Sequence, residues 1–289
     1  MRGTAMCLVV PPITSRARRS VKTWAGRLGI SCVVAIGLTG FARPAWAGAW
    51  TLDAGTGALV FTGTAMQSNS AFDSGSKQRP IPRYSKSEAQ ALIEYGVTDW
   101  FTAIVQPSLQ HVDIAAPISA QRSGLGYTDI GGRVRLWSNS AWVVSAQATV
   151  RIPGTFDKTN PAAIGYTDHE LELRGLAGYS FKAGTLPAFV DLQLAQRFRL
   201  GGPPDEFRTD ITFGVRPADR WLLLAQSFNV VSEGAGTWGF GSFAYHKVQL
   251  SAVYALTPTL SLQLGGYSTY WGRNALQENG LVVGAWYRF

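Results

Sequence analysis

The sequence predicts an all-β protein, a transmembrane antiparallel up-and-down β-barrel of about 12 strands (10–14), preceded by a cleaved signal peptide. Three observations lead to this prediction. The chain ends in a strand with one apolar and aromatic face, polar and apolar residues alternate along most other segments, and tight turns alternate with longer loops. Apolar residues that are dispersed rather than clustered are the weak signal that membrane strands leave in a sequence.

The C-terminal strand carries the strongest signal. Successive side chains of a strand point to opposite faces, so every second residue of 281–289 shares a face. One face of this strand is apolar and aromatic throughout, and the opposite face carries Arg288, Trp286, Gly284 and Val282. A terminal strand of this kind resembles the closing strand and assembly signal of bacterial outer-membrane β-barrels, and an ordinary sheet strand is the alternative. The candidate assembly signal consists of Leu281, Val283, Ala285, Tyr287 and Phe289.

Alternation is clearest in residues 168–178, where Glu170, Glu172 and Arg174 share one face and apolar residues occupy the other. Alternation with a period of two over such lengths predicts β-strands. The expected strands cover residues 57–68, 84–97, 100–113, 125–138, 141–153, 167–181, 187–200, 205–217, 220–232, 243–256, 259–272 and 279–289.

The connections between these strands fall into two classes that alternate along the chain. Short turns are expected at residues 98–99, 139–140, 183–186, 217–219 and 257–258. Mostly longer loops are expected at residues 69–83, 114–124, 154–166, 201–204, 233–242 and 273–278. An even number of strands with this alternation, and with both termini on the short-turn side, is typical of an up-and-down membrane barrel. A soluble sandwich gives no reason for such a pattern.

Residues 1–47 have the composition of a secretion signal. They hold seven basic residues and no acidic one, and the apolar run at 28–41 is shorter than the about 20 residues of a spanning helix. The small residues Ala45 and Ala47 then predict cleavage after Ala47. We therefore expect a signal peptide at 1–47 and a single outer-membrane β-barrel domain at 48–289, secreted across the inner membrane of a Gram-negative cell.

Removal of the signal changes the charge of the chain. The whole sequence has a net charge of +8, but losing seven of 26 basic residues and none of 18 acidic ones leaves 19 against 18, a net charge of +1. Charge therefore gives no support for nucleic-acid binding. Both cysteines, Cys7 and Cys32, leave with the signal, so the mature chain can form no disulfide, and no cofactor is expected.

The surrounding lipid determines which face of each strand points outward. Lipid cannot satisfy free backbone polar groups, so membrane strands must close into a barrel with apolar faces outside and charged faces inside. Candidate aromatic girdle residues near strand ends are Trp100, Trp142, Trp221, Tyr254 and Trp271. The expected lumen or constriction residues are Arg133, Arg135, Arg151, Glu170, Glu172, Arg174, Asp191, Arg197, Arg199, Arg208, Asp210 and Arg216.

Two interpretations of this charged lumen stay open. One is a network of ion pairs that stiffens a narrow barrel and closes it, and the other is an arginine-rich constriction that selects anionic or polar solutes. Barrels of about eight strands are filled by side chains, and barrels of about sixteen or more hold a water channel. A barrel of about twelve strands lies between them, so the strand number does not decide whether the lumen is open. Inward amides and one inward aromatic residue would suit a saccharide path: Gln90, Gln106, Gln110, Gln147, Gln193, Gln226, Gln249, Gln263 and Trp137.

Catalysis has little support in the sequence. His111, His169 and His246 fall on the expected outward faces, and no Gly-x-Ser-x-Gly elbow, phosphate loop or zinc-ligand spacing occurs. Glu170 and Glu172 could form an acid/base pair, but the neighbouring arginines are the expected ion partners. We therefore expect neither an enzyme nor a metal site.

Three stretches resemble a family called phenol meta-pathway outer-membrane proteins. Residues 94–100 (EYGVTDW) resemble its strand–turn–strand signature, and residues 124–131 resemble its glycine-rich strand start, with Tyr127-Thr128 displacing a Gly-Asp pair. Residues 214–228 and the C-terminal strand look more like the XagA-type branch. The resemblance implies a barrel tied to uptake of small aromatic compounds or to export or anchoring of extracellular polysaccharide, and the fold alone cannot choose between them.

Three functions therefore stand as hypotheses. The first is a narrow channel for small polar or anionic solutes or saccharides. The second is a component of exopolysaccharide secretion or adhesion that works through loops 69–83 and 154–166, and the third is a largely closed structural barrel. Aromatic uptake is disfavoured, because no continuous apolar inner face is evident. The expected partners are outer-membrane lipid, the barrel-assembly machinery, and polysaccharide or a small solute, with no nucleic acid.

Overall fold

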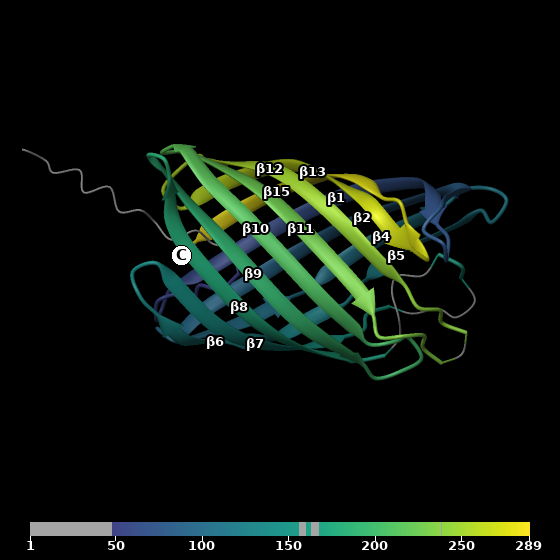
Figure 1. The fold of residues 1–289 in the computed structure, drawn as a ribbon, viewed down its shortest axis with the longest axis horizontal. Coiled ribbons are helices and arrows are strands. Elements are labelled where there is room, and N and C mark those ends of the chain that lie inside the picture. The colour runs from purple at the N-terminus through teal and green to yellow at the C-terminus, as the bar shows by residue number, and fades with distance from the viewer. Residues whose placement is uncertain (1–47, 156–159, 163–167, 238) are drawn as a thin grey trace, which may run out of the picture. The chain divides into compact units, whose positions relative to one another are not determined.

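The computed structural model describes residues 48–155, 160–162, 168–237 and 239–289. Within these residues, twelve strands form one closed antiparallel barrel, as the sequence predicts (Figure 1). The described part of the chain contains no helix that is long and apolar enough to cross a membrane. The predicted cleavage residues, Ala45 and Ala47, lie outside the described residues.

Three of the twelve strands are interrupted, so the barrel is built from fifteen segments. Pro107, which has no N–H to donate, separates β3 from β4. Gly126 and Tyr127 separate β5 from β6, and residues 277–278 separate β14 from β15. The segments are β1 (Gly57–Phe72), β2 (Gln78–Thr98), β3 (Phe101–Gln106), β4 (Ser108–Ile114), β5 (Ala120–Leu125), β6 (Thr128–Ser138), β7 (Trp142–Ile152), β8 (Glu170–Ala183), β9 (Leu186–Arg199), β10 (Glu206–Ala218), β11 (Trp221–Ser232), β12 (Ala244–Ala255), β13 (Leu260–Arg273), β14 (Ala275–Leu276) and β15 (Asn279–Arg288).

Antiparallel pairing of β1 with β15 closes the barrel, beginning with Ala58 opposite Arg288. Just beyond this pair, the N–H of Gly57 donates to the carbonyl of Phe289 at 2.7 Å, and the N–H of Phe289 donates back to Gly57 at 3.1 Å. A Cβ atom at Gly57 would lie 2.2 Å from the Phe289 ring. The glycine therefore lets the C-terminal aromatic ring pack over the start of the first strand.

The first hairpin is longer than the sequence predicts. The expectation of a long loop at residues 69–83 is wrong, because β1 continues to Phe72 and β2 begins at Gln78. In the short turn between them, the Asp73 carboxylate accepts the N–H groups of Gly75 and Lys77, each at 2.9 Å. Both faces of this hairpin are rich in polar residues, so no apolar alternation marks it as a strand pair.

Side chains on each strand divide between the lumen and the outer surface. On β9, Leu192 and Leu194 point outward and are 38% and 44% exposed, whereas Asp191 and Arg197 point inward and are 0% and 7% exposed. The alternate residues of the C-terminal strand divide in the same way, with Leu281 outward and 65% exposed. The outer surface is apolar and the interior largely polar, which is the arrangement that a barrel needs in lipid.

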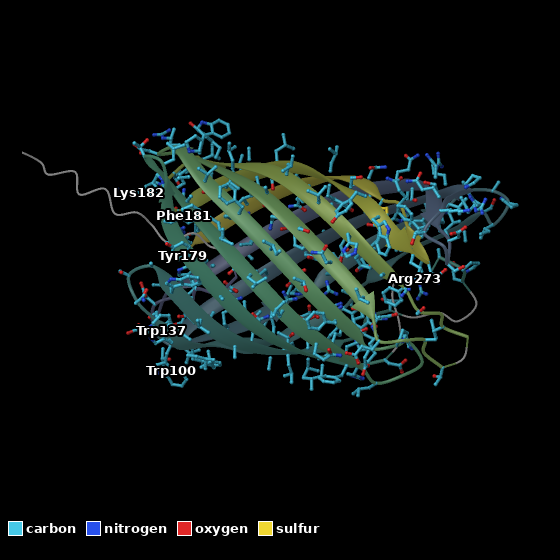
Figure 2. All side chains as sticks on the ribbon, viewed as in Figure 1. Trp100, Trp137, Tyr179, Phe181, Lys182 and Arg273 are labelled. Carbon is cyan, nitrogen blue, oxygen red and sulfur yellow. The ribbon has the colours of Figure 1, made fainter. Side chains whose placement is uncertain are left out.

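Outward aromatic residues gather at the end of the barrel that carries the tight turns. Trp100 is labelled at this end in Figure 2, and Trp142 is the first residue of β7, directly after a turn. Trp221 and Tyr254 pack against each other at the same end, with ring centroids 4.9 Å apart. Of the five girdle candidates, these four lie at the tight-turn end, and Trp271 lies near the loop end of β13.

Trp137 does not point into the lumen, so that prediction is wrong. A bulge between Arg135 and Trp137 shifts the register, which places Trp137 opposite the outward-facing Val144 of β7. Trp137 is consequently 53% exposed on the outer surface, and Figure 2 shows it near Trp100 at the tight-turn end. A bulge adds one residue to a strand and reverses the facing of the residues after it, and alternation alone does not reveal it.

Candidate functional site

An N-terminal segment, residues 48–56, lies inside the barrel at the tight-turn end. The inner wall holds its backbone: the N–H of Leu52 donates to Thr102 Oγ1 at 2.9 Å, and Arg133 Nη1 donates to the carbonyl of Trp50 at 3.1 Å. No alternation marks this segment, so the sequence predicts no role for it. Its position inside the lumen is a finding of the structure.

Trp50 anchors the N-terminal segment in a group of apolar side chains inside the barrel. Its ring meets the ring of Phe189 edge-on, with centroids 5.8 Å apart. Gly178 makes room for it, because a Cβ atom there would lie 2.5 Å from the Trp50 ring. We call this group the apolar layer, and it consists of Trp50, Phe189, Leu222, Leu224, Val253 and Trp286.

A second part of the lumen is charged, and its arginines and carboxylates are paired. The Glu172 carboxylate accepts hydrogen bonds from Arg174 at 2.9 Å and from Arg197 at 2.6 Å. Arg174 also reaches Asp210 at 2.6 Å, so one carboxylate and one guanidinium link three strands, β8, β9 and β10. Charged groups this deeply buried are stable only when they are paired and hydrogen-bonded.

Glu170 and Glu206 extend this network toward the loop end. Arg199 donates a hydrogen bond to Glu206 and forms an ion pair with Glu170 at 3.3 Å. Arg197 lies 3.6 Å from Glu170 and 3.7 Å from Glu206. Arg208 adds a contact of 3.3 Å to Glu206. Each carboxylate therefore has more than one guanidinium partner. The charged wall, as we call these residues, comprises Glu170, Glu172, Arg174, Arg197, Arg199, Glu206, Arg208 and Asp210.

Two further ion pairs continue the charges around the lumen. Arg151 binds Asp129 through two nitrogens at 2.7 and 2.9 Å, and Arg133 binds Glu94 of β2 at 2.9 Å. The sequence predicted Arg133 and Arg151 as lumen residues but not their partners. Strand alternation could have identified both partners, because Asp129 lies opposite Arg151 on the adjacent strand and Glu94 lies on the inward face of β2.

The structure brings together ten of the twelve expected lumen residues. Arg135 and Arg216 lie apart from them, near the tight-turn ends of β6 and β10. Glu206 was not expected and completes the charged wall. The ten residues are Arg133, Arg151, Glu170, Glu172, Arg174, Asp191, Arg197, Arg199, Arg208 and Asp210.

Uncharged polar residues line the lumen on β11 to β13. Gln249 donates to Gln226 at 3.0 Å, and Gln226 donates to Thr212 at 3.2 Å. Gln263 donates to Ser251 at 3.0 Å and accepts the indole N–H of Trp286 at 3.1 Å. We call Gln226, Gln249 and Gln263 the amide wall. These neutral groups form a chain of hydrogen bonds in which Ser251 accepts from both Gln249 and Gln263, and no ionised group takes part.

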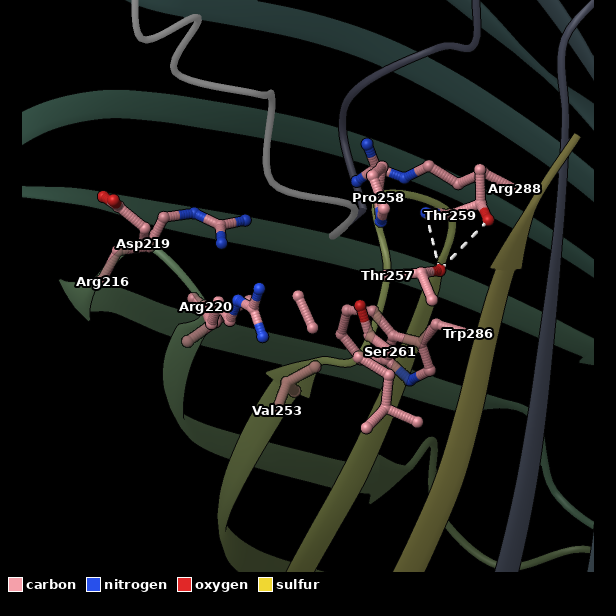
Figure 3. A pocket seen from close by; sticks show the side chains of 13 residues that line it. Arg216, Asp219, Arg220, Val253, Thr257, Pro258, Thr259, Ser261, Trp286 and Arg288 are labelled. Carbon is pink, nitrogen blue, oxygen red and sulfur yellow. Dashed lines mark hydrogen bonds between the residues drawn. The ribbon is translucent and has the colours of Figure 1, made fainter.

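Two cavities inside the barrel, both formed by described residues, share no lining residue. The central cavity has a volume of about 530 Å³ and is lined by the N-terminal segment and by charged residues that include Arg151 and Arg208. The second cavity, about 290 Å³, lies at the tight-turn mouth and is lined by Arg216, Arg220 and Arg288 among others (Figure 3). The apolar layer contributes to both, with Trp50 on the central cavity and Leu222, Val253 and Trp286 on the mouth.

The charged wall contains the two glutamates that could form an acid/base pair. Both carboxylates of the candidate pair, Glu170 and Glu172, are bound to guanidinium groups. Among the described residues, no group of three His, Cys, Asp or Glu side chains could hold a metal ion. The central cavity presents hydrogen-bond donors and acceptors on several sides.

Solved structures show the same fold. The chain is similar to the COG4313 outer membrane channel from Pseudomonas putida F1, with 15% sequence identity and a TM-score of 0.72 over 83% of this chain and 98% of that one. It is also similar to the NanC porin, with 9% identity and a TM-score of 0.50 over 79% of this chain and 98% of that one. At these identities the likeness concerns the fold, which is that of outer-membrane β-barrels.

The sequence itself places the chain in no family. No protein-family model matches it, and no curated protein matches it. The resemblance to phenol meta-pathway and XagA-type proteins therefore stays a prediction, and the proposed function rests on the geometry of the lumen.

Proposed function

We propose that this protein is an outer-membrane channel for small polar solutes whose tight-turn end is closed by its own N-terminal segment. The observation that supports the proposal is the polar central cavity of about 530 Å³ inside a barrel with an apolar outer surface. Cavities that hold small molecules commonly measure about 300–1,000 Å³. The cavity is therefore large enough for a small solute.

The outer surface supports a location in the outer membrane. Outward leucines such as Leu250, Leu264 and Leu281 are 63%, 64% and 65% exposed, and such surfaces are stable only against lipid or another apolar partner. The outward face of the C-terminal strand also has the alternation expected of a signal for the barrel-assembly machinery. Lipid and this machinery are accordingly the proposed partners, after secretion across the inner membrane.

The charges of the lumen favour polar over strongly anionic solutes. Arg174 and Arg197 are each held by two or more carboxylates, so little uncompensated positive charge faces the central cavity. A paired guanidinium still presents hydrogen-bond donors at its edges. We therefore propose neutral or zwitterionic polar solutes, small saccharides included, as the class that this lumen admits.

A closed structural barrel is the second candidate, because the apolar layer separates the two cavities. The exopolysaccharide hypothesis has less support, since one of its two loops, 69–83, is largely a strand hairpin. The other, 154–166, lies partly outside the described residues. Aromatic uptake also has little support, because the apolar layer is confined to the tight-turn end and does not form a continuous path along the described strands.

Single-channel recording of the mature chain in a planar bilayer tests the proposal. We expect small conductance steps with weak ion selectivity, and larger steps from Trp50→Ala, because that substitution removes the centre of the apolar layer. Trp142→Ala is the matched control, since it removes an outward tryptophan from the same end. Silence from both inserted wild type and Trp50→Ala would favour the structural barrel.

A further inference from the structure

Asp191 is a buried carboxylate that has no cationic side chain beside it. It is 0% exposed and faces the lumen from β9. Its Oδ2 accepts the N–H of Ala49 at 2.8 Å, and its Oδ1 accepts Gln193 Nε2 at 2.6 Å. Among the described residues, no Lys, Arg or His nitrogen lies within 4.0 Å of it. An ionised carboxylate without a countercharge is strongly destabilising when buried.

The carboxylates of the charged wall and of the two neighbouring ion pairs all have arginine partners. They are Glu94, Asp129, Glu170, Glu172, Glu206 and Asp210. The arginines that pair with them are Arg133, Arg151, Arg174, Arg197, Arg199 and Arg208. Six arginines thus pair with six carboxylates, and Asp191 is a seventh carboxylate for which the described residues provide no such partner.

Gly48, next to Ala49 in the chain, also lies close to Asp191. A Cβ atom at Gly48 would lie 2.1 Å from both Asp191 Oδ1 and Gln193 Nε2, so any side chain there would collide with the carboxylate. Gly48 also has a φ of 61°, in the region that favours glycine. It directly follows Ala47, after which the sequence predicts signal cleavage. Cleavage would therefore create an amino terminus at the carboxylate.

We propose that signal cleavage supplies the missing cation, and that the α-ammonium group of Gly48 pairs with Asp191 to latch the N-terminal segment inside the lumen. A signal peptidase hydrolyses the Ala47–Gly48 peptide bond with one water molecule. The water provides the hydroxyl of the new Ala47 carboxylate and a hydrogen on the Gly48 nitrogen, which takes up one more proton to become an ammonium. The uncleaved chain has a neutral amide at this position.

The latch fastens the far end of a segment that is already tied at its near end. Next to β1, the N–H of Gly55 donates to the carbonyl of Gly96 at 2.8 Å. At the far end, Ser145 Oγ donates to the carbonyl of Ala49 at 2.5 Å. The ammonium adds a charge-assisted contact, the stronger kind of hydrogen bond, so the tight-turn end closes fully only after maturation. This inference rests on cleavage after Ala47 and not on the identity of any solute.

Zero-length cross-linking of protein purified from outer membranes tests the latch directly. Mass spectrometry should first find Gly48 as the N-terminal residue. A carbodiimide should then join Gly48 to Asp191 through an amide, with loss of one water mass. The Lys247–Glu278 pair, at 2.5 Å, provides an internal reference for the same chemistry. Neither readout requires the barrel to conduct, so failure here is distinct from failure of the channel proposal.

Two substitutions make the test specific. Asp191→Asn should abolish the Gly48 cross-link and leave the Lys247–Glu278 cross-link in place, whereas Glu278→Gln should do the reverse. Absence of the Gly48 link in wild-type barrel that shows the reference link would overturn the proposal. A different N-terminal residue, or a Gly48 link to another carboxylate, would overturn it equally.

A refolded chain that retains Ala47 provides a second, independent measurement. Its amino group is displaced by one residue from Asp191, so reductive methylation of the folded barrel should modify it at least about tenfold faster than the amine of chain 48–289, which is shielded until the segment detaches. Methylation of unfolded protein controls for intrinsic reactivity. Equal rates in the two folded barrels would show that Gly48 is not held by Asp191.

Discussion

The charged wall on β8 to β10 and the amide wall on β11 to β13 lie side by side around one lumen, but they reach stability in different ways. On the charged wall most carboxylates are shared between arginines: Glu172 binds two arginines, and Arg174 binds two carboxylates. On the amide wall Gln249 and Gln263 bind only neutral neighbours, and both donate to Ser251. Buried charge thus requires many partners at once, so the charged wall should respond to substitution as a unit and the amide wall residue by residue.

The largest expected effect tests which residues of β9 face the lipid and which face the lumen. Leu192→Arg with Leu194→Arg should prevent stable insertion, because each arginine near the middle of the lipid face costs about 2–4 kcal/mol. Insertion can be measured by the heat-modifiable gel mobility of the protein refolded into lipid vesicles. Leu192→Ala with Leu194→Ala is the uncharged control and should insert. Normal insertion of the arginine variant would show that Leu192 and Leu194 do not face the lipid, so the inward and outward faces of β9 would be wrongly assigned.

The next effect should come from the centre of the charged wall. Glu172→Ala leaves Arg174 and Arg197 without their shared carboxylate, so the free energy of unfolding should fall by about 3–5 kcal/mol. Urea titration in lipid vesicles, followed by tryptophan fluorescence, measures the change. A loss no larger than that of an amide-wall variant would contradict the distinction between the two walls.

Removal of charged-wall cations should alter conduction more than insertion. Arg197→Ala with Arg199→Ala leaves Glu170 and Glu206 in excess, so the pore should become wider and shift toward cation preference. The reversal potential in a salt gradient is the measurement. Arg79→Ala, on the exposed first hairpin where Arg79 pairs with Asp73, is the control that removes a cation outside the lumen. No shift in reversal potential would place Arg197 and Arg199 away from the conducting path.

The smallest effect belongs to the amide wall. Gln249→Ala removes a neutral hydrogen bond to Gln226 and a longer one to Ser251, at 3.5 Å. Because one neutral bond contributes about 0.5–1.5 kcal/mol, the free energy of unfolding should fall by about that amount. The same urea titration applies, and Gln249→Glu sharpens the test because it places a new charge without an arginine partner nearby. A severe loss from the alanine variant would show that the amide wall, too, acts as a coupled network.

The sequence was sufficient for those features that strand periodicity determines. The alternation around Glu170 and Glu172 predicted both the strand and its inward face, since a period of two has only two possible facings. Where the period is interrupted, prediction failed: one bulged residue turned Trp137 outward. The polar hairpin at 69–83 also went unrecognised, because a strand with polar residues on both faces shows no alternation.

The N-terminal segment could not have been predicted by the same reasoning. Trp50 is placed by Phe189 and Gly178, which lie more than a hundred residues away in sequence, and by Arg133 on a third strand. Such contacts depend on the closed barrel and leave no local pattern. Glu206, by contrast, could have been found: it lies in the expected strand 205–217, and the period of two places it on the face of Arg208 and Asp210.

The N-terminal segment has a geometric consequence for the pore. The number of strands sets the circumference of a barrel, but a fixed perimeter can enclose a large round area or a small flattened one. By binding Thr102 on β3 and Asp191 on β9 from within, the segment acts as a strut that fixes the separation of two points on that perimeter. Two barrels with equal strand numbers can therefore differ in conducting area through a few residues that belong to no strand.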